Sequence, residues 1–347
     1  MYVEVKVIPY SYKSAGIDRI ETEDLKDKIA SFASITHDNN VVKSGSSFAG
    51  IYRLSGYTKP MLISSTDGVG SKLNIATLLD HYESIGVDLV NLNVNDIITC
   101  GAKPLFLLDY ISIGKLDHQV IEPLMRGMAW ACRAVECSII GGETAQAPDL
   151  YRGNNFDIAG TIVGVVEEDA IIDFNEVNKG DVLLGIPSSG VHTNGFTLIR
   201  SVFDIDNKPS ALFDHYMELG HTLGEELLVP HRNYYLLLEP HFNNLKAIAH
   251  ITGGGLIGNL PRVLPPGLAA VINTDSWDSQ PIFSMIQAKG VDIVEMYHVF
   301  NMGLGMVLIC EPSKADELQG AMQSARIIGE VVSQIDDRRV MFNPAID

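Results

Sequence analysis

The chain has 347 residues, of which 46% are hydrophobic and 20% are charged, values typical of a globular protein with a sizeable core. Its 43 acidic and 25 basic residues give a formal net charge of -18. Because nucleic acids and anionic membranes are bound by clustered Lys and Arg, this charge argues against both as partners. A small phosphorylated substrate remains compatible with it, since a few cations, backbone amides and a metal ion suffice to bind phosphate.

The first six residues lack the basic segment and apolar core of a signal peptide. The longest apolar runs, such as residues 302–310, are far shorter than the roughly 20 residues that span a bilayer. The four cysteines form no C-x-x-C pair and lie in apolar stretches, which is typical of free thiols in a reducing compartment. We therefore expect a soluble, cytoplasmic protein.

In the first half, short apolar runs alternate with segments of helical periodicity. Apolar residues repeat at helical spacing from Val90 to Ile98, whereas Asp88, Asn91 and Asn95 fall on another face of the same helix. The predicted elements are strands at 51–54 and 60–65, a helix at 87–100, a strand at 104–113, a helix at 120–136, and strands at 137–140 and 158–166.

The length of the chain predicts two domains. The stretch 167–180 is acidic and lacks long apolar runs, so we place the boundary there, between domains of residues 1–168 and 176–347. Strands interleaved with helices in both halves predict an α/β or α+β fold. The second half has predicted strands at 181–186, 247–251, 269–272 and 305–309, and predicted helices near 196–202, 216–227, 234–242, 281–288 and 315–325.

The segment SSTDGVGSK, residues 64–72, follows a predicted buried strand. Its glycines let backbone amides approach a phosphate, Asp67 can hold Mg²⁺ through oxygen, and Lys72 supplies a positive charge. The order G-x-x-x-x-G-K-[ST] is absent, so the segment is no P-loop. The alternative is a tight strand-to-helix turn with Asp67 as the N-cap.

Two further carboxylates occupy positions that suit metal ligands. Asp96 follows Asn95 inside the half-buried predicted helix, where Asp is an unfavourable residue; a solvent-facing or hydrogen-bonded Asp96 is the alternative. Glu143 follows Gly141 and Gly142 at the predicted end of a strand, where open α/β sheets place ligands. Here the alternative is a turn with a surface Glu.

Two loops of the second half are polar or rich in glycine. Residues 188–195, SSGVHTNG, offer hydroxyls, His192 and Asn194 for phosphate binding or proton transfer, or form a merely structural loop. Residues 252–258, TGGGLIG, match the G-x-G-x-x-G of a nicotinamide or flavin dehydrogenase. Pro261 interrupts the long helix that a dehydrogenase requires, and that alternative leaves the acidic motifs of the first half unexplained.

Taken in order, these motifs resemble those of phosphoribosylformylglycinamidine cyclo-ligases, also called aminoimidazole ribonucleotide synthetases. That family carries G-T-D-G-V-G-T-K, V-N-D, G-G-E-T-A-E-M-P and S-S-G-x-H-S-N-G. The resemblance runs collinearly from about residue 10 to residue 310, and its other motifs here are SYKSAGID at 11–18, HITGGG at 250–255, PRVLP at 261–265, EMY at 295–297 and FNMGLGM at 300–306.

The resemblance implies ATP-dependent closure of formylglycinamidine ribonucleotide to aminoimidazole ribonucleotide, with release of ADP and phosphate. It also implies a two-domain α/β (α+β) fold and a homodimer in which first-domain sheets pair. The first domain would bind ATP and Mg²⁺, and the second would contribute substrate-binding loops. A non-catalytic ATP-binding protein of the same fold is the alternative, and substrate-dependent ADP release separates the two.

The same resemblance assigns roles to residues. Asp67, Asp96 and Glu143 are expected to hold Mg²⁺, directly or through water. In the third motif Glu143 is the expected charged ligand, because Gln146 stands where the family usually has Glu. The expected catalytic residues are Lys13 and Lys72, which neutralise phosphate charge, and His192 and Asn194 of the polar loop. Contacts to ATP phosphates are expected from Thr66, Gly68, Gly70, Gly141, Gly142 and Thr144, and contacts to the substrate from Ser189, Gly253, Gly254 and Gly255.

Overall fold

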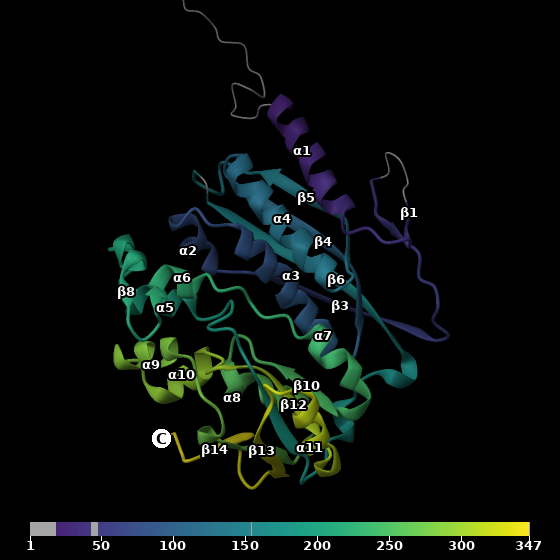
Figure 1. Cartoon of the computed structure of the whole chain (residues 1–347), viewed down its shortest axis with the longest axis vertical. Helices are drawn as coiled ribbons and strands as arrows, with labels where there is room; N and C mark the ends of the chain where they lie inside the picture. The colour runs from purple at the N-terminus through teal and green to yellow at the C-terminus, as the bar shows by residue number, and fades with distance from the viewer. Residues whose placement is uncertain (1–18, 43–47, 154, 347) are drawn as a thin grey trace, which may run out of the picture.

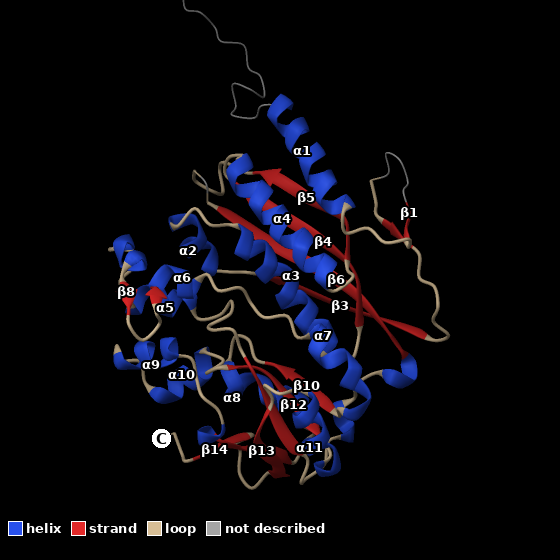
Figure 2. Cartoon of the chain, viewed as in Figure 1, coloured by secondary structure: helices blue, strands red, loops and turns tan. Residues whose placement is uncertain are grey.

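The computed structural model describes residues 19–42, 48–153 and 155–346. Two separate sheets, each with helices packed on it, lie one above the other in Figures 1 and 2. Lys13 and the rest of the motif at 11–18 lie outside the described residues. Among those residues, no helix has the length and apolar character needed to cross a membrane.

The first sheet has four strands in the order β3-β6-β4-β5. Neighbouring strands in this sheet are antiparallel except for β4 and β5, which run parallel. The strand pairing places Asp67, Gly160, Asp109 and Gly142 in one row across the sheet. The strands are β3 (Pro60–Gly68), β4 (Lys103–Ile113), β5 (Ser138–Gln146) and β6 (Phe156–Glu167).

Helices cover one face of this sheet only (Figure 1). The helices α3 (Glu83–Ile98) and α4 (His118–Ala134) pack together on it, and α1 (Arg19–Ser34) lies against α4 and β5. Glycines allow α3 and α4 to approach closely, because a Cβ at Gly86 or Gly127 would overlap the backbone of the other helix. The opposite face exposes large apolar side chains: Leu62 at 61%, Leu108 at 36% and Tyr110 at 47%.

The second sheet has six strands, antiparallel except for the pair β11–β14. Its strand β12, which has a neighbour on each side, is buried along its whole length, which explains the apolar run that the sequence shows there. In spatial order the strands are β10 (Ala247–His250), β12 (Leu304–Cys310), β7 (Val182–Pro187), β13 (Arg326–Ser333), β11 (Leu268–Asn273) and β14 (Val340–Asn343).

Shorter elements complete the fold. Two hairpins are formed by β1 (Val41–Val42) with β2 (Ile51–Tyr52) and by β8 (His215–Tyr216) with β9 (His221–Thr222). The remaining α-helices are α2 (Lys72–Leu78), α5 (Phe196–Val202), α6 (Leu223–Leu227), α7 (Tyr235–Leu238), α8 (Gly255–Asn259), α9 (Pro281–Ala288), α10 (Ile293–Val299) and α11 (Pro312–Ala321). The 3-10 turns are Glu168–Ala170, Phe174–Glu176, Pro209–Phe213, Glu239–Asn244, Leu260–Val263 and Thr274–Ser276.

The mixed α/β architecture is the predicted one, and the helices at 196–202 and 281–288 have the predicted bounds. One predicted helix is wrong, because residues 216–227 form a hairpin and the short α6, and Gly220 has a φ of 78° at the turn. The predicted end of the strand at 137–140 is also wrong, since β5 continues through Gly141 and Gly142 to Gln146.

The polar face of α3 joins the two domains. Asp88 accepts a hydrogen bond from the backbone N–H of His231 at 2.6 Å, and Asn91 donates to the carbonyl of His231 at 2.6 Å. One turn further, Asn95 donates to the carbonyl of Arg232 at 2.8 Å and accepts from the N–H of Tyr234 at 3.1 Å. These side chains therefore fix the segment 231–234, which belongs to the second half of the chain, against a helix of the first.

Candidate active site

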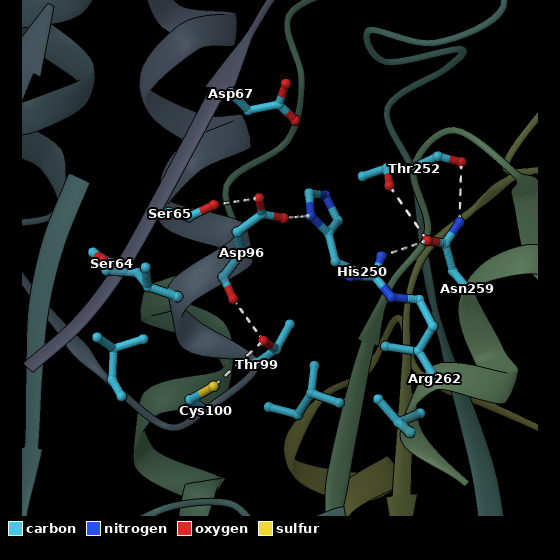
Figure 3. A pocket seen from close by; sticks show the side chains of 15 residues that line it. Ser64, Ser65, Asp67, Asp96, Thr99, Cys100, His250, Thr252, Asn259 and Arg262 are labelled. Carbon is cyan, nitrogen blue, oxygen red and sulfur yellow. Dashed lines mark hydrogen bonds and ion pairs between the residues drawn. The ribbon is translucent and has the colours of Figure 1, made fainter. Parts of the chain in front are cut away.

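A cavity of about 460 Å³ lies between the two halves of the chain (Figure 3). The strand β3 and the C-terminal end of α3 form one wall, and β10 with the loop after it forms the other. The polar residues that line the cavity are Ser64, Ser65, Asp67, Asp96, Thr99, His250, Thr252, Asn259 and Arg262.

Asp96 lies in the last turns of α3, and both of its carboxylate oxygens accept hydrogen bonds. Ser65 donates to one oxygen at 2.9 Å, and His250 Nδ1 lies 2.8 Å from the other. Burial by itself would raise the pKa of Asp96, but His250, Ser65 and the nearby charge of Arg262 outweigh it and lower that pKa. Asp96 is therefore an ionised carboxylate held in one orientation by groups from both domains.

Asp67 lies on β3, two residues beyond Ser65, so the alternation of a strand points both side chains toward α3 and the cavity. Its backbone N–H donates to Asn93 of α3 at 3.1 Å, and its Oδ1 accepts from the N–H of Gly68 at 2.7 Å. Burial, together with the negative charge of Asp96, raises the pKa of Asp67. A cation placed between Asp67 and Asp96 would relieve this repulsion.

A chain of three histidines extends from Asp96 into the interior. His231 Nε2 lies 3.1 Å from His250 Nε2, Thr193 Oγ1 lies 3.3 Å from His231 Nδ1, and the ring of His192 stacks on His231 at 3.8 Å. One set of tautomers satisfies this network: Thr193 donates to His231, His231 to His250, and His250 to Asp96. Burial lowers the pKa of His231 and of His192, so both rings are neutral.

The glycine loop 252–255 follows β10, and its first residue, Thr252, lines the cavity. Gly254 and Gly255 have positive φ values of 97° and 57°, and a Cβ on Gly255 would overlap the carbonyl of Tyr297. A Cβ on Gly253 would lie 3.1 Å from Asn194 Oδ1, which places Asn194 beside the loop. β10 pairs antiparallel with β12, and α8 has only five residues, so the dehydrogenase arrangement, a strand followed by a long crossover helix, is absent here.

The prediction that Glu143 shares a metal ion with Asp67 and Asp96 is wrong within one chain. Glu143 pairs in register with the exposed Tyr110 and belongs to the uncovered face of the first sheet. Gly142, next to it, is three strands away from Asp67, about 14 Å at roughly 4.8 Å per strand. Among the described residues, no three His, Cys, Asp or Glu side chains gather as a metal site.

Lys72 and His192 do not have the positions that direct phosphate contact requires. The side chain of Lys72 is 0% exposed, where its ammonium forms an ion pair with Asp88 at 2.7 Å and donates to the carbonyl of Val229 at 2.9 Å. His192 is 2% exposed and accepts from the N–H of Ser189 at 3.2 Å. Neither residue lines the cavity. The Ser189 hydroxyl donates to the carbonyl of Pro230 at 2.6 Å.

The remaining predicted phosphate-binding residues fall in two places. Thr66 points to the uncovered sheet face, with its hydroxyl 2.9 Å from that of Thr161. Gly68 ends β3, and Gly70 has a φ of 69° in the turn before α2. A groove that includes Asp109 and Glu143, away from the cavity, is bordered by Gly141, Gly142 and Thr144.

Four residues that the motifs did not single out by role belong to these sites. His250, Asn259 and Arg262 line the cavity, and the HITGGG and PRVLP segments that contain two of them were the available signal. Asp109 lies under Gly142, where a Cβ would overlap its carboxylate. Burial, with the nearby charge of Glu143, raises the pKa of Asp109 to about 7.

Comparison with known proteins defines the class of this chain. Residues 47–166 match the family described as AIR synthase related protein, N-terminal domain, and residues 178–340 match its C-terminal domain. A thiamine-monophosphate kinase from Stenotrophomonas maltophilia K279a has the same fold, with a TM-score of 0.68 at 15% identity over 93% of this chain and 96% of that one. The structure of hydrogenase maturation protein HypE in complex with ATP has a TM-score of 0.62 at 16% identity, over 91% of this chain and 90% of that one.

Curated relatives are much more similar in sequence. The phosphoribosylformylglycinamidine cyclo-ligase of Thermoanaerobacter sp. (strain X514) is 44% identical over 93% of this chain and 97% of its own length. The phosphoribosylformylglycinamidine cyclo-ligase of Brevibacillus brevis is 43% identical over 96% of this chain and 98% of its own length. The chain therefore belongs to the phosphoribosylformylglycinamidine cyclo-ligase family, whose members are ligases that close a ring at the expense of ATP in purine biosynthesis.

Proposed function

We propose that the cavity between the domains is the site of this ring closure, and that Asp67 and Asp96 hold Mg²⁺ there against the phosphates of ATP. The carboxylate pair carries the proposal. Asp96 is ionised, accepts hydrogen bonds from Ser65 and His250, and lies near the charge of Arg262. Asp67 has one carboxylate oxygen without a hydrogen bond from any described residue. Carboxylate oxygens at a strand and a helix end are ligands that Mg²⁺ prefers, and the ion would neutralise charge on the transferred phosphoryl group.

The proposed chemistry begins with an amide oxygen, which is a poor leaving group. Transfer of the γ-phosphoryl group of ATP to the formyl oxygen releases ADP and makes phosphate the leaving group. The amidine nitrogen then attacks the same carbon, loses a proton and expels phosphate, which closes the imidazole ring. The residues of the cavity mainly position the two reactants and exclude water, which is where most of the rate of such transfers arises.

Within this proposal, His250 orients Asp96 and does not take part in proton transfer to the substrate. Both of its ring nitrogens already have partners, Asp96 and His231. Asn194 and the amides of Gly253 and Gly254 remain the groups proposed for the substrate side, because they lie next to Thr252, which lines the cavity from the second domain. The N–H of Gly255 donates to the carbonyl of Thr252 at 3.1 Å, so this glycine is proposed to shape the loop. Lys13 lies outside the described residues, and its proposed role as a phosphate ligand rests on the family resemblance alone.

The uncovered face of the first sheet supports the proposal of a homodimer. A monomer rarely exposes large neighbouring apolar side chains on the flat face of a sheet, and Leu62, Leu108 and Tyr110 do so here. Glu143 lies on this face, so we propose that Glu143, Gly141, Gly142 and Thr144 act at or near the dimer interface.

The decisive experiment measures ADP release by the full chain with ATP, Mg²⁺ and formylglycinamidine ribonucleotide. ADP and aminoimidazole ribonucleotide should form in equal amounts, and omission of the ribonucleotide should abolish both. A non-catalytic ATP-binding protein would show no release that depends on the ribonucleotide.

Asp67→Asn tests the metal assignment. Loss of one carboxylate ligand should raise the Mg²⁺ concentration needed for half-maximal turnover at least tenfold, on the order of 1.4 kcal/mol of binding. Glu317→Gln, on the exposed surface of α11, is the matched control and should leave that concentration unchanged. Near-normal turnover of Asp67→Asn at limiting Mg²⁺ would refute the assignment.

A further inference from the structure

The two walls of the cavity differ in charge. The wall from the first domain presents the carboxylates Asp67 and Asp96, which repel a phosphate group. The wall from the second domain presents Thr252, Asn259 and Arg262. Figure 3 shows Arg262 on the side of Asn259, across the cavity from Asp67. A phosphorylated molecule that enters this cavity therefore meets a positively charged side chain, among the described residues, only on the second-domain wall.

Arg262 is the only Lys or Arg among the described residues that line this cavity. No described carboxylate lies within ion-pair distance of its guanidinium, whose one hydrogen bond goes to Asn259 Oδ1 at a long 3.4 Å. The side chain of Arg262 is exposed, so most of its N–H donors are free. An arginine that makes no ion-pair contact with a described carboxylate and lines a cavity of an acidic protein is suited to bind an anion from solution.

Asn259 connects Arg262 to the glycine loop. Its amide nitrogen donates to the carbonyls of Thr252, Gly253 and Gly255 at 3.3, 3.1 and 2.9 Å, and its amide oxygen accepts from Arg262. Asn259 therefore links the loop to the guanidinium, so that backbone N–H groups of the loop and the planar guanidinium can contact the same phosphate. A lysine, which offers a single point charge, could not reproduce two parallel hydrogen bonds.

We propose that Arg262 anchors the phosphate of the ribonucleotide substrate and so makes the enzyme select the phosphorylated substrate over the free nucleoside. This inference rests on the proposed function and adds a specificity-determining residue to it. The alternative anchors do not fit, since the ammonium of Lys72 is buried against Asp88 and both nitrogens of His250 have partners.

The test compares Arg262→Gln and Arg262→Lys with the wild type, using formylglycinamidine ribonucleotide and its dephosphorylated nucleoside. For the ribonucleotide, Arg262→Gln should raise KM about 10- to 100-fold, the value of a hydrogen bond to a charged group. The kcat and the KM for ATP should stay within about threefold, and Arg262→Lys should recover part of the loss. For the nucleoside, wild type and Arg262→Gln should have the same kcat/KM, because the phosphate is missing.

Arg326→Gln is the matched control, because Arg326 is an exposed arginine of β13 that contacts only backbone carbonyls. It should leave both substrates unaffected. A rise in KM that is equal for ribonucleotide and nucleoside, or confined to ATP, would overturn the inference while leaving ring closure established. Equal melting temperatures of wild type and Arg262→Gln exclude misfolding as the cause of a loss.

Calorimetric titration with ribose 5-phosphate keeps the inference testable if the wild type shows no ring closure. In that case the proposed function fails, and the titration alone decides the role of Arg262. Binding by the wild type that Arg262→Gln loses would support a phosphate site. Equal binding by both proteins, or no binding by the wild type, would refute it.

Discussion

Lys72 and Asp88 form an ion pair whose two side chains are both 0% exposed. Burial raises the pKa of Asp88, while the charge of Lys72 and the N–H of His231 act in the opposite direction. Each charge therefore depends on its partner to remain in the interior. The motif around Lys72 resembles a phosphate-binding turn in sequence, but in the fold its ammonium stabilises the contact between the domains.

Lys72→Met should lower the free energy of unfolding by about 3–5 kcal/mol, because it leaves Asp88 buried without its partner. Urea denaturation measures the change. The double variant Lys72→Met with Asp88→Leu should recover much of the loss, since no unpaired charge remains. If Lys72→Met keeps wild-type stability and loses only affinity for ATP, the phosphate role suggested by the sequence is the correct one.

Asp109 predicts a pH dependence of stability. Its pKa rises from an ordinary value of 3.8 to about 7 in the folded chain, because it is buried and the negative charge of Glu143 is nearby. Between these values the folded chain binds more protons than the unfolded chain, so the free energy of unfolding falls as the pH rises through this range. Asp109→Asn removes this effect.

The variant should therefore gain stability relative to the wild type, on the order of a few kcal/mol, between about pH 4 and about pH 7. Thermal or urea unfolding at several pH values gives the measurement. Asp337→Asn, at an exposed position, should leave the slope unchanged. A stability difference between Asp109→Asn and wild type that is independent of pH would contradict the burial argument.

At the scale of elements, the short helix α8 contains two glycines, Gly255 and Gly258, whose surroundings differ. Gly255 has a φ of 57°, and a Cβ there would overlap the carbonyl of Tyr297, whereas a Cβ on Gly258 in the same helix meets no atom within 4 Å. Gly255→Ala should cost about 1–3 kcal/mol from the backbone conformation alone and displace the loop that borders the cavity.

Gly258→Ala should be neutral or stabilise the chain by roughly 0.5–1 kcal/mol, because Ala is favoured over Gly inside a helix. The two substitutions add the same methyl group three residues apart, so differential scanning calorimetry of the pair separates local strain from a general effect of alanine. Equal melting temperatures for the two variants would show that the close approach to Tyr297 does not constrain Gly255.

Elements with strong periodicity could be predicted from the sequence, and elements shaped by distant contacts could not. The apolar repeat from Val90 to Ile98 located α3, and the apolar run of β12 located a central strand. Gly141–Gly142 read as a turn but lie within β5, because Gly142 makes room for the carboxylate of Asp109 on the neighbouring strand. That packing depends on a strand pairing that local sequence does not encode.

The candidate site divides in the same way. The motifs around Asp67 and Asp96 indicated that both could be metal ligands, and the fold brings both to one cavity. The sequence could not show that Glu143 lies on the other face of the sheet, because its motif has the same glycine-flanked form as that of Asp67. Nor could it show that the partner of Lys72 is Asp88, sixteen positions further along the chain, and not a bound phosphate.

At the scale of the whole molecule, the uncovered face of the first sheet predicts self-association. Leu108→Glu places a charge among Leu62, Leu108 and Tyr110, so it should convert a dimer into a monomer in light scattering coupled to size-exclusion chromatography. Leu236→Glu, on α7, alters a side chain that is 64% exposed and lies off the sheet, and it should leave the mass unchanged. A wild-type mass equal to one chain would contradict the dimer.

Four hydrogen bonds join side chains of α3 to backbone groups of residues 231–234, and a fifth joins the side chains of Asn91 and Asn233 at 3.0 Å. The 3-10 turn Phe174–Glu176 in the connection between the domains contributes none of them. A cut in the peptide chain at that turn would therefore leave the contact whole, and two fragments produced from separate reading frames could reassemble and restore catalysis by complementation. Exchange of halves between relatives would, by the same reasoning, demand compatible residues along α3 and at Asn233. The other positions of 231–234 contribute backbone groups to these bonds, so the bonds would tolerate substitution there.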